Sequence, residues 1–361
     1  SIYTCRHQGS VIKTIKAITQ SASLMTFSSM FVRSFSPLVI IPFGLISNSA
    51  QDIALYLLLL TVVQICYFID FGLTPTLSRF IAYAGTRDNN KSQENSLTLS
   101  LGLIPENIKL SPVIKFTHIL YCILGAGVLV LLVILRHSIA DSNSFESESI
   151  IGKYAWDSLI IGMPILIWGM KYSIFLTGTN KIHIEQTAAF IVGLISITAQ
   201  ILAMVLFGKL LIIFIIVIVF EVLGVFLKRS LSNRYCFDAD TIVSASKVVL
   251  SSHLELIKKI FASVWRQGLG VLLGYGVTQL SLIILVSGVG AGAAASVLLA
   301  VRYLNFTNIV SQVPFYVKVP VMSQLRSKLN NVDADSVAKE RMTHSLLLFI
   351  FGATLTFIAL P

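Results

Sequence analysis

Four basic residues stand inside stretches that are apolar enough to cross a membrane: Arg33, Lys171, Arg266 and Arg302. A charged side chain costs about 2.5–3.5 kcal/mol at the bilayer centre on insertion scales, so each one needs water, an anion or a carboxylate nearby. Lys171 and Arg266 lie close enough to predicted helix ends for their side chains to reach the interface by snorkelling. Arg33 and Arg302 lie eight or nine residues inside, roughly 12–14 Å deep, and are hard to explain as membrane anchors.

Polar side chains accompany the two deep arginines at spacings of three and four residues, which place side chains on one face of a helix. Two such polar stripes favour a hydrated, cationic cavity between helices. The alternative is a clasp in which an arginine pairs with a carboxylate, either Asp70 or Glu221. The stripes comprise Thr26, Ser29, Arg33 and Ser36 in one helix and Arg302, Asn305, Gln312 and Tyr316 in the other.

The segment 70–85 interrupts a long apolar run. Pro75 cannot donate a backbone hydrogen bond and clashes one turn back, so it predicts a kinked or broken helix. Two interpretations stay open: a moving element that contains Asp70, Pro75 and Arg79, or a plain helix end with Arg79 as an interfacial anchor. Glu221, inside a later apolar run, is either a proton or cation site or a neutral, hydrogen-bonded acid.

Composition places the whole chain in a membrane. Its 361 residues are 55% hydrophobic and 12% charged, whereas soluble domains carry about 25% charged residues. At about 20 apolar residues per crossing, the sequence predicts an all-α polytopic protein with nine membrane-spanning helices. The predicted spans are 24–46, 53–72 with a bent continuation to about 85, 116–135, 156–178, 186–207, 210–227, 263–287, 293–318, and one that begins near 344.

When the N-terminus is placed in the cytoplasm, most basic residues fall on the cytoplasmic side of the membrane. Of the 27 Lys and Arg residues, 20 then fall in cytoplasmic segments, 3 in outside loops and 4 inside spans. This excess is typical of cytoplasmic loops, which face anionic lipid. It accounts for the formal charge of +10, and we expect no nucleic-acid partner. The His and Cys residues lack metal-ligand spacing, so we expect neither a metal nor a cofactor.

A short internal repeat suggests two lobes. Pro75–Ser78, followed by Arg79, recurs as Pro320–Ser323, followed by Arg326, at equivalent points of two helix pairs. The offset predicts two parallel repeats of six helices, which is a common plan in transporters. We expect an N-terminal six-helix lobe over 1–230, a cytoplasmic linker over 231–262 and part of a C-terminal lobe over 263–361. About three helices of a complete second lobe would then be missing, so we expect a C-terminally incomplete chain.

Two stretches resemble a known family. FIDFGLTPTLSRFIAYA, at 68–84, is similar to the second helix of bacterial O-antigen (Wzx-like) polysaccharide flippases, and 301–326 resembles their eighth helix. These flippases belong to the multidrug/oligosaccharidyl-lipid/polysaccharide exporter superfamily. The resemblance implies a multi-pass protein of the bacterial cytoplasmic membrane with its N-terminus inside. It implies two lobes around a central cavity and the transfer of undecaprenyl-diphosphate-linked oligosaccharide to the outer leaflet, without enzymatic activity.

The resemblance also gives the candidate residues a role. Arg33 and Arg302 would bind the diphosphate, because guanidinium groups bind phosphate in bidentate geometry, and Arg266 and Lys171 are secondary candidates. Hydroxyl and amide groups would follow the sugars: Ser29, Ser36, Asn305 and Gln312. The residues expected to bend or couple, with H⁺ or Na⁺ as the possible coupling ion, are Asp70, Pro75, Arg79 and Glu221.

Two rival functions remain open. A cation-coupled multidrug exporter of the same superfamily would need carboxylates in its central lobe, and the first predicted helix carries Arg33 and no acid. A membrane polysaccharide polymerase or ligase would need a sizeable outside loop with catalytic residues. The longest outside loop, 136–155, is acidic and Ser-rich but shows no convincing catalytic set.

Overall fold

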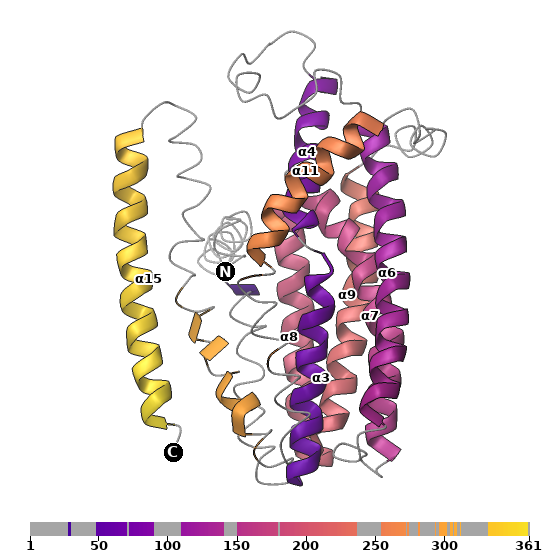
Figure 1. Cartoon of the computed structure of the whole chain (residues 1–361), viewed down its shortest axis with the longest axis vertical. Helices are drawn as coiled ribbons and strands as arrows, with labels where there is room; N and C mark the ends of the chain where they lie inside the picture. The colour runs from indigo at the N-terminus through magenta and orange to yellow at the C-terminus, as the bar shows by residue number, and fades with distance from the viewer. Residues whose placement is uncertain are drawn as a thin grey trace, which may run out of the picture.

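The computed structural model describes eight helices and some shorter pieces of the chain (Figure 1). The described residues are 28–29, 48–70, 72–89, 110–140, 150–179, 181–236, 254–271, short pieces between 273 and 311, and 331–359. No strand occurs among them. The helices are α3 (Ala50–Phe68), α4 (Leu73–Asn89), α6 (Leu110–Ala140), α7 (Ile150–Gly178), α8 (Ile182–Phe207), α9 (Leu210–Tyr235), α11 (Leu254–Val271) and α15 (Asn331–Ala359).

Five of the described helices are long and apolar enough to cross a membrane: α3, α6, α7, α8 and α9. They correspond to the spans predicted at 53–72, 116–135, 156–178, 186–207 and 210–227, which confirms the all-helical membrane class for this part of the chain. Several of these helices are longer than the prediction, because hydropathy measures the hydrocarbon crossing and not the polar turns beyond it. The nine-helix, two-lobe arrangement stays a prediction, since nearly all of the first span and about half of the seventh and eighth spans lie outside the described residues.

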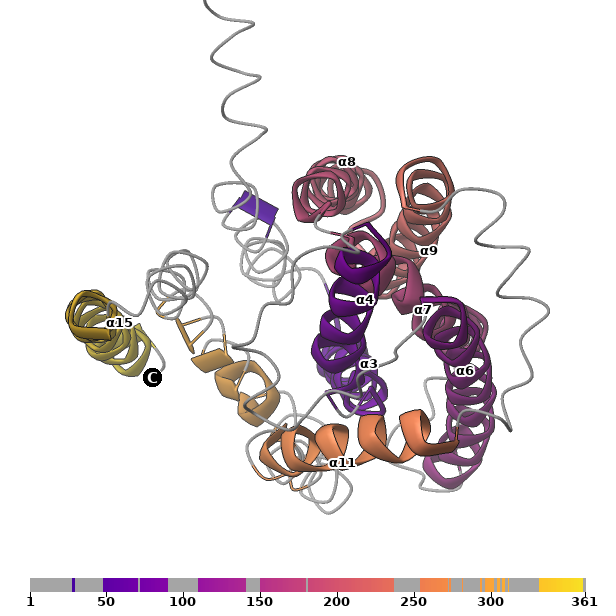
Figure 2. The same ribbon diagram turned by 90° about the horizontal axis from the view of Figure 1, so that it is seen from above.

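Helix α11 overlaps the first nine residues of the span predicted at 263–287, and the rest of that span lies almost entirely outside the described residues. It begins at Leu254, alternates buried Ile260 and Val264 with exposed Phe261 and Trp265, and packs against α4. Seen from above, it runs across one side of the bundle (Figure 2). A helix with one buried face and one exposed face is typical of a position at the surface of a bundle. Within 254–271 the structure therefore shows an amphipathic helix, which is not among the candidate spans.

Helix α7 is central to the group of spans. It packs against α9, α6, α4, α3 and α8, as Figure 2 shows in part. Gly162 and Gly169 lie one heptad apart on α7, and a side chain at either position would overlap with Ile218 or Val225 of α9. Small residues of this kind let membrane helices approach closely. The close contact between α7 and α9 thus depends on these two glycines.

The chain breaks between α3 and α4, but Pro75 is not the cause. The helix ends at Phe68, and Gly72 adopts a left-handed conformation with a φ of 75°, which glycine tolerates best. Pro75 is the third residue of α4. In the first turn of a helix its missing N–H removes no hydrogen bond. The predicted bend is therefore present, whereas the proposed kink at Pro75 is wrong, because the chain turns upstream of it.

The turn between α8 and α9 is held by a distant residue. Gly208, with a φ of 63°, ends α8 in the gap between the predicted spans 186–207 and 210–227. Asn48, just before α3, donates its Nδ2 to Gly208 O at 2.9 Å and accepts at Oδ1 from Leu210 N at 3.2 Å. One amide side chain thus satisfies two backbone groups that the helix ends leave open.

Candidate functional site

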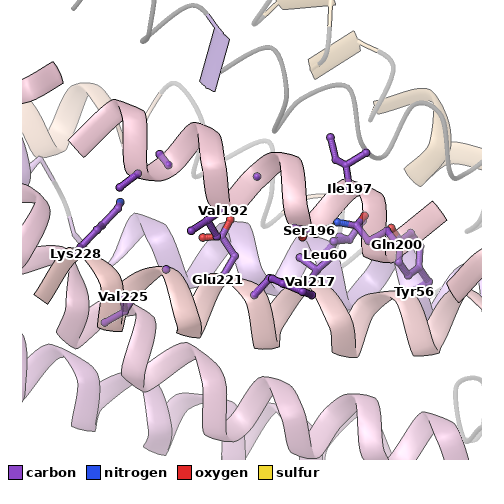
Figure 3. A pocket seen from close by; sticks show the side chains of 15 residues that line it. Tyr56, Leu60, Val192, Ser196, Ile197, Gln200, Val217, Glu221, Val225 and Lys228 are labelled. Atoms are coloured by element: carbon purple, nitrogen blue, oxygen red, sulfur yellow. Dashed lines mark hydrogen bonds between the residues drawn. The ribbon is translucent and has the colours of Figure 1, made fainter. Parts of the chain in front are cut away.

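A cavity of about 220 Å³ lies between α3, α8 and α9 (Figure 3). Much of its described wall is apolar, with Val192 on α8 and Val217 on α9. A few polar groups interrupt this wall, as is usual in ligand sites. They are Tyr56, Ser196, Gln200, Glu221 and Lys228.

The polar groups follow one another along the cavity. On α8, the buried Gln200 donates its Nε2 to Ser196 Oγ at 2.9 Å, one turn away. Glu221 faces them from α9, and Figure 3 shows it between this pair and Lys228. Amide, hydroxyl and carboxylate groups together offer both hydrogen-bond donors and acceptors. The cavity can therefore hold a polar group of a ligand among membrane-spanning helices.

An ion pair closes the end of the cavity near Lys228. Its Nζ lies 3.1 Å from Glu185 Oε1 on α8 and donates to Ser173 Oγ on α7 at 3.0 Å. Glu185 Oε2 accepts from Gln186 Nε2 at 2.7 Å, and Gln186 Oε1 accepts from Ser29 Oγ at 2.5 Å. This network ties α7, α8 and α9 to the helical pair 28–29. Ser29 is thus bonded to α8 and is not among the residues that line the cavity.

Asp70 joins the α3–α4 break to α6. Its Oδ2 accepts from Thr74 N at 3.2 Å, and its Oδ1 accepts from Thr74 Oγ1 at 3.0 Å and from the buried Tyr121 hydroxyl. Burial raises the pKa of the Asp70 carboxyl, and these hydrogen bonds oppose the rise. Within the described residues Asp70 contacts no arginine, and Arg79 donates its Nε to Pro75 O at 3.0 Å. The observed role of Asp70 is to cap α4 and fasten it to α6.

Lys171 does not snorkel, contrary to expectation. Its side chain is fully buried, and Nζ lies 3.7 Å from the centre of the Trp168 ring and 5.1 Å from that of Tyr172. The same Nζ is 3.0 Å from His118 Nδ1 on α6. The prediction was wrong because it considered only the distance to the helix end. Aromatic faces and an imidazole nitrogen stabilise the ammonium group inside the protein instead.

The remaining predicted site residues stay untested by the structure. Arg33, Ser36, Arg302 and Gln312 lie outside the described residues, and Arg266 lies in α11 with no description of its side chain. Asn305 is a half-buried helical residue. The cationic cavity expected between Arg33 and Arg302 therefore remains a prediction.

Sequence reasoning missed most of the observed cavity. Ser196 and Gln200 are four residues apart in an apolar helix, and this spacing was a readable signal for a shared face. Lys228 was counted only as a cytoplasmic charge, and its partner Glu185 was not singled out. Their pairing could not be read from the sequence, because it depends on how α8 packs against α9.

Two further observations complete the description of the site. Among the described residues, no group of three or more His, Cys, Asp or Glu side chains is placed to hold a metal ion. Compared with known protein families, with curated proteins and with solved structures, the chain matches none.

Proposed function

We propose that the protein is a transporter that moves an undecaprenyl-diphosphate-linked oligosaccharide from the inner to the outer leaflet of the bacterial cytoplasmic membrane. The observation that carries the proposal is the polar cavity between α3, α8 and α9. Burial of polar groups in a membrane helix is costly and usually marks a solute path. The resemblance of 68–84 and 301–326 to O-antigen flippases and the cytoplasmic excess of basic residues support the same conclusion.

The cavity chemistry suits part of a sugar. Gln200 and Ser196 offer an amide and a hydroxyl, Glu221 offers a carboxylate, and Tyr56 adds an aromatic ring with a hydroxyl. Sites for drug-sized ligands measure about 300–1,000 Å³, so a cavity of about 220 Å³ would take a single sugar unit of the cargo. The diphosphate would be bound by Arg33 and Arg302, with the lipid tail left in the bilayer.

Complementation tests this proposal. The gene would be expressed in a bacterium that lacks its own O-unit flippase, and surface polysaccharide would be stained. Restored polymer that falls at least severalfold with Gln200→Leu or Arg33→Ala is the expected result. Thr198→Val is the matched control, because Thr198 is an exposed polar residue of α8 between the two cavity residues. Restoration unaffected by Gln200→Leu would remove the cavity from the transport path.

One observation favours a second function, cation-coupled export of drugs. Glu221 is a carboxylate in the wall of the cavity, and an intramembrane acid is a typical site for a coupling ion or a cationic substrate. Efflux of a cationic dye that stops with Glu221→Gln, together with failed complementation in a well-expressed protein, would support this function over the flippase.

A further inference from the structure

A second polar cluster lies where α6, α7 and α9 meet, away from the residues that line the cavity. Its centre is Trp168 on α7, with Lys171 Nζ 3.7 Å from the ring centre and Arg229 Cζ of α9 at 5.8 Å. Both distances are within the range of cation–π attraction. His118 of α6 joins through its Nδ1, 3.0 Å from Lys171 Nζ. Two cations from two helices thus lie over one indole, and His118 of a third helix joins them through Lys171.

The cluster contains no negative charge. Within the described part of the chain, no carboxylate contacts Lys171, His118 or Arg229; Cys122 and Tyr172 are the other titratable side chains that interact with Lys171. The ion pairs of the described helices lie elsewhere, at Arg136–Asp157, Lys228–Glu185 and Arg341–Glu340. Cations in a low-dielectric environment are costly without a counter-charge. An anion at this site would compensate them.

The cluster lies at the depth of lipid headgroups. Lys171 is seven residues from the end of α7, roughly 10 Å along the axis. The 29 residues of α7 span roughly 43 Å, whereas the hydrocarbon core measures about 30 Å, so Lys171 stands near the core boundary. Trp168 and Tyr172 fit the aromatic belt of such an interface. In the predicted orientation this is the cytoplasmic leaflet.

The outer side of the cluster is accessible from the membrane. His118 and Arg229 are exposed side chains, and the neighbouring Ile119 and Ile123 of α6 are exposed apolar residues suited to contact acyl chains. With Lys171 Nζ as the donor to His118 Nδ1, the imidazole hydrogen lies on Nε2. His118 then presents an N–H donor with no partner among the described residues.

We propose that His118, Arg229 and Trp168 form a binding site for the phosphate group of an anionic lipid in the cytoplasmic leaflet. Arg229 and the Nε2–H of His118 contact phosphate oxygens, and Trp168 packs beside the headgroup. Lys171 is a positioning residue: it holds His118 by Nδ1 and adds positive charge beneath the site. Basic pockets between membrane helices on this side are suited to anionic headgroups. The inference does not rest on the proposed transport function, because a bilayer lipid can fill the site whatever the cargo.

Native mass spectrometry of the detergent-solubilised chain tests the site. Phosphatidylglycerol and phosphatidylcholine with identical acyl chains would be titrated against wild type, Arg229→Gln, His118→Gln and Arg234→Gln. Arg234 is the matched control, since it is an exposed arginine farther along α9 that contacts Tyr235 and not Trp168. We expect preferential binding of phosphatidylglycerol and a loss of affinity of about fivefold for Arg229→Gln, as for one basic residue near a headgroup.

The outcomes distinguish binding at this site from non-specific attraction of an anionic lipid to basic residues. Loss of affinity in Arg229→Gln and His118→Gln, with little change in Arg234→Gln, would support it. Equal binding of the two lipids, or equal losses in both arginine variants, would overturn it. A parallel titration with undecaprenyl diphosphate identifies the source of the phosphate: the lipid whose binding depends on Arg229 is the occupant. If neither lipid depends on Arg229, the site does not exist.

Discussion

At the scale of single residues, Asp70 is the side chain whose surroundings say most about its role. It accepts hydrogen bonds from the backbone and hydroxyl of Thr74 and from the Tyr121 hydroxyl. The first two bonds cap α4, and the third reaches across to α6. A carboxylate that accepts several hydrogen bonds holds the donating elements, here α4 and α6, in a fixed arrangement. The α3–α4 break would then move together with α6 and not independently of it.

Tyr121→Phe tests this connection between α4 and α6. The variant removes one hydrogen bond to a carboxylate while keeping the buried ring, so we expect a loss of about 1.5–3 kcal/mol in the free energy of unfolding. Thermal unfolding in detergent, followed by circular dichroism, would measure it. Tyr154→Phe is the control, because Tyr154 is 61% exposed on α7 and should change stability by less than about 0.5 kcal/mol. Equal effects of the two variants would mean that the Tyr121–Asp70 hydrogen bond makes no measurable contribution to the free energy of unfolding.

The protonation of Asp70 makes a second prediction. Burial raises its pKa above the ordinary 3.8, so the folded state favours the protonated acid more than the unfolded state does. This contribution to stability is complete below the unfolded pKa and is lost as the pH rises through the folded pKa. Relative to Asp70→Asn, which cannot ionise, the wild type should therefore lose stability in detergent unfolding experiments as the pH rises above the ordinary pKa of 3.8. A difference between the two proteins that stays constant as the pH rises would contradict the raised pKa.

The sequence could identify Asp70 and Pro75 as part of an unusual segment, because an acid, a glycine and a proline follow an apolar run. It could not identify Tyr121, which lies 51 positions away in the chain. It also favoured Pro75 as the bend, whereas the left-handed Gly72 and the Asp70 cap make the turn first. The sequence thus indicated that the segment around Asp70 is unusual, but it could not indicate which distant residue binds Asp70.

At the scale of helices, α7 and α9 pack so closely that Gly162 leaves no room for a side chain. Gly162→Val would place its methyl groups against Ile218 of α9. Overpacking of this kind typically costs about 1–3 kcal/mol, so we expect a lower unfolding temperature and a lower yield of folded protein. Size-exclusion chromatography and thermal unfolding in detergent would report both.

Gly127→Val is the control for that variant. Gly127 lies on an exposed side of α6, and a side chain there would meet nothing within 4 Å. The same substitution should therefore leave stability nearly unchanged. If Gly127→Val were as harmful as Gly162→Val, the loss could not be assigned to the α7–α9 contact.

The positions of the helices could be predicted from the sequence better than the contacts between them. Apolar length located the five described spans, and Gly208 marked the turn between α8 and α9. The cap of that turn by Asn48 was not predictable, since the two lie 160 positions apart. The first part of the predicted span at 263–287 is the amphipathic α11. Hydropathy over a long window did not separate the alternating pattern of 254–271 from the apolar residues that follow.

At the scale of the whole molecule, the distribution of basic residues predicts an orientation. Lys153 lies in the first turn of α7 on the predicted outside, and Arg234 lies in the last turn of α9 on the predicted inside. In a background without the native cysteines, Lys153→Cys should react with a membrane-impermeant maleimide in intact cells, and Arg234→Cys should react only after lysis. Labelling of Arg234→Cys in intact cells would invert the topology and move the headgroup site to the other leaflet.

Transport of a lipid-linked oligosaccharide is the central claim, and reconstitution tests it most directly. Purified protein would be placed in vesicles with a fluorescent lipid-linked oligosaccharide in both leaflets, and membrane-impermeant dithionite would then be added. We predict quenching well beyond the roughly half of the signal that starts in the outer leaflet, with slower quenching in Gln200→Leu and wild-type rates in Thr198→Val. Quenching that stops at the protein-free level would contradict the proposed function.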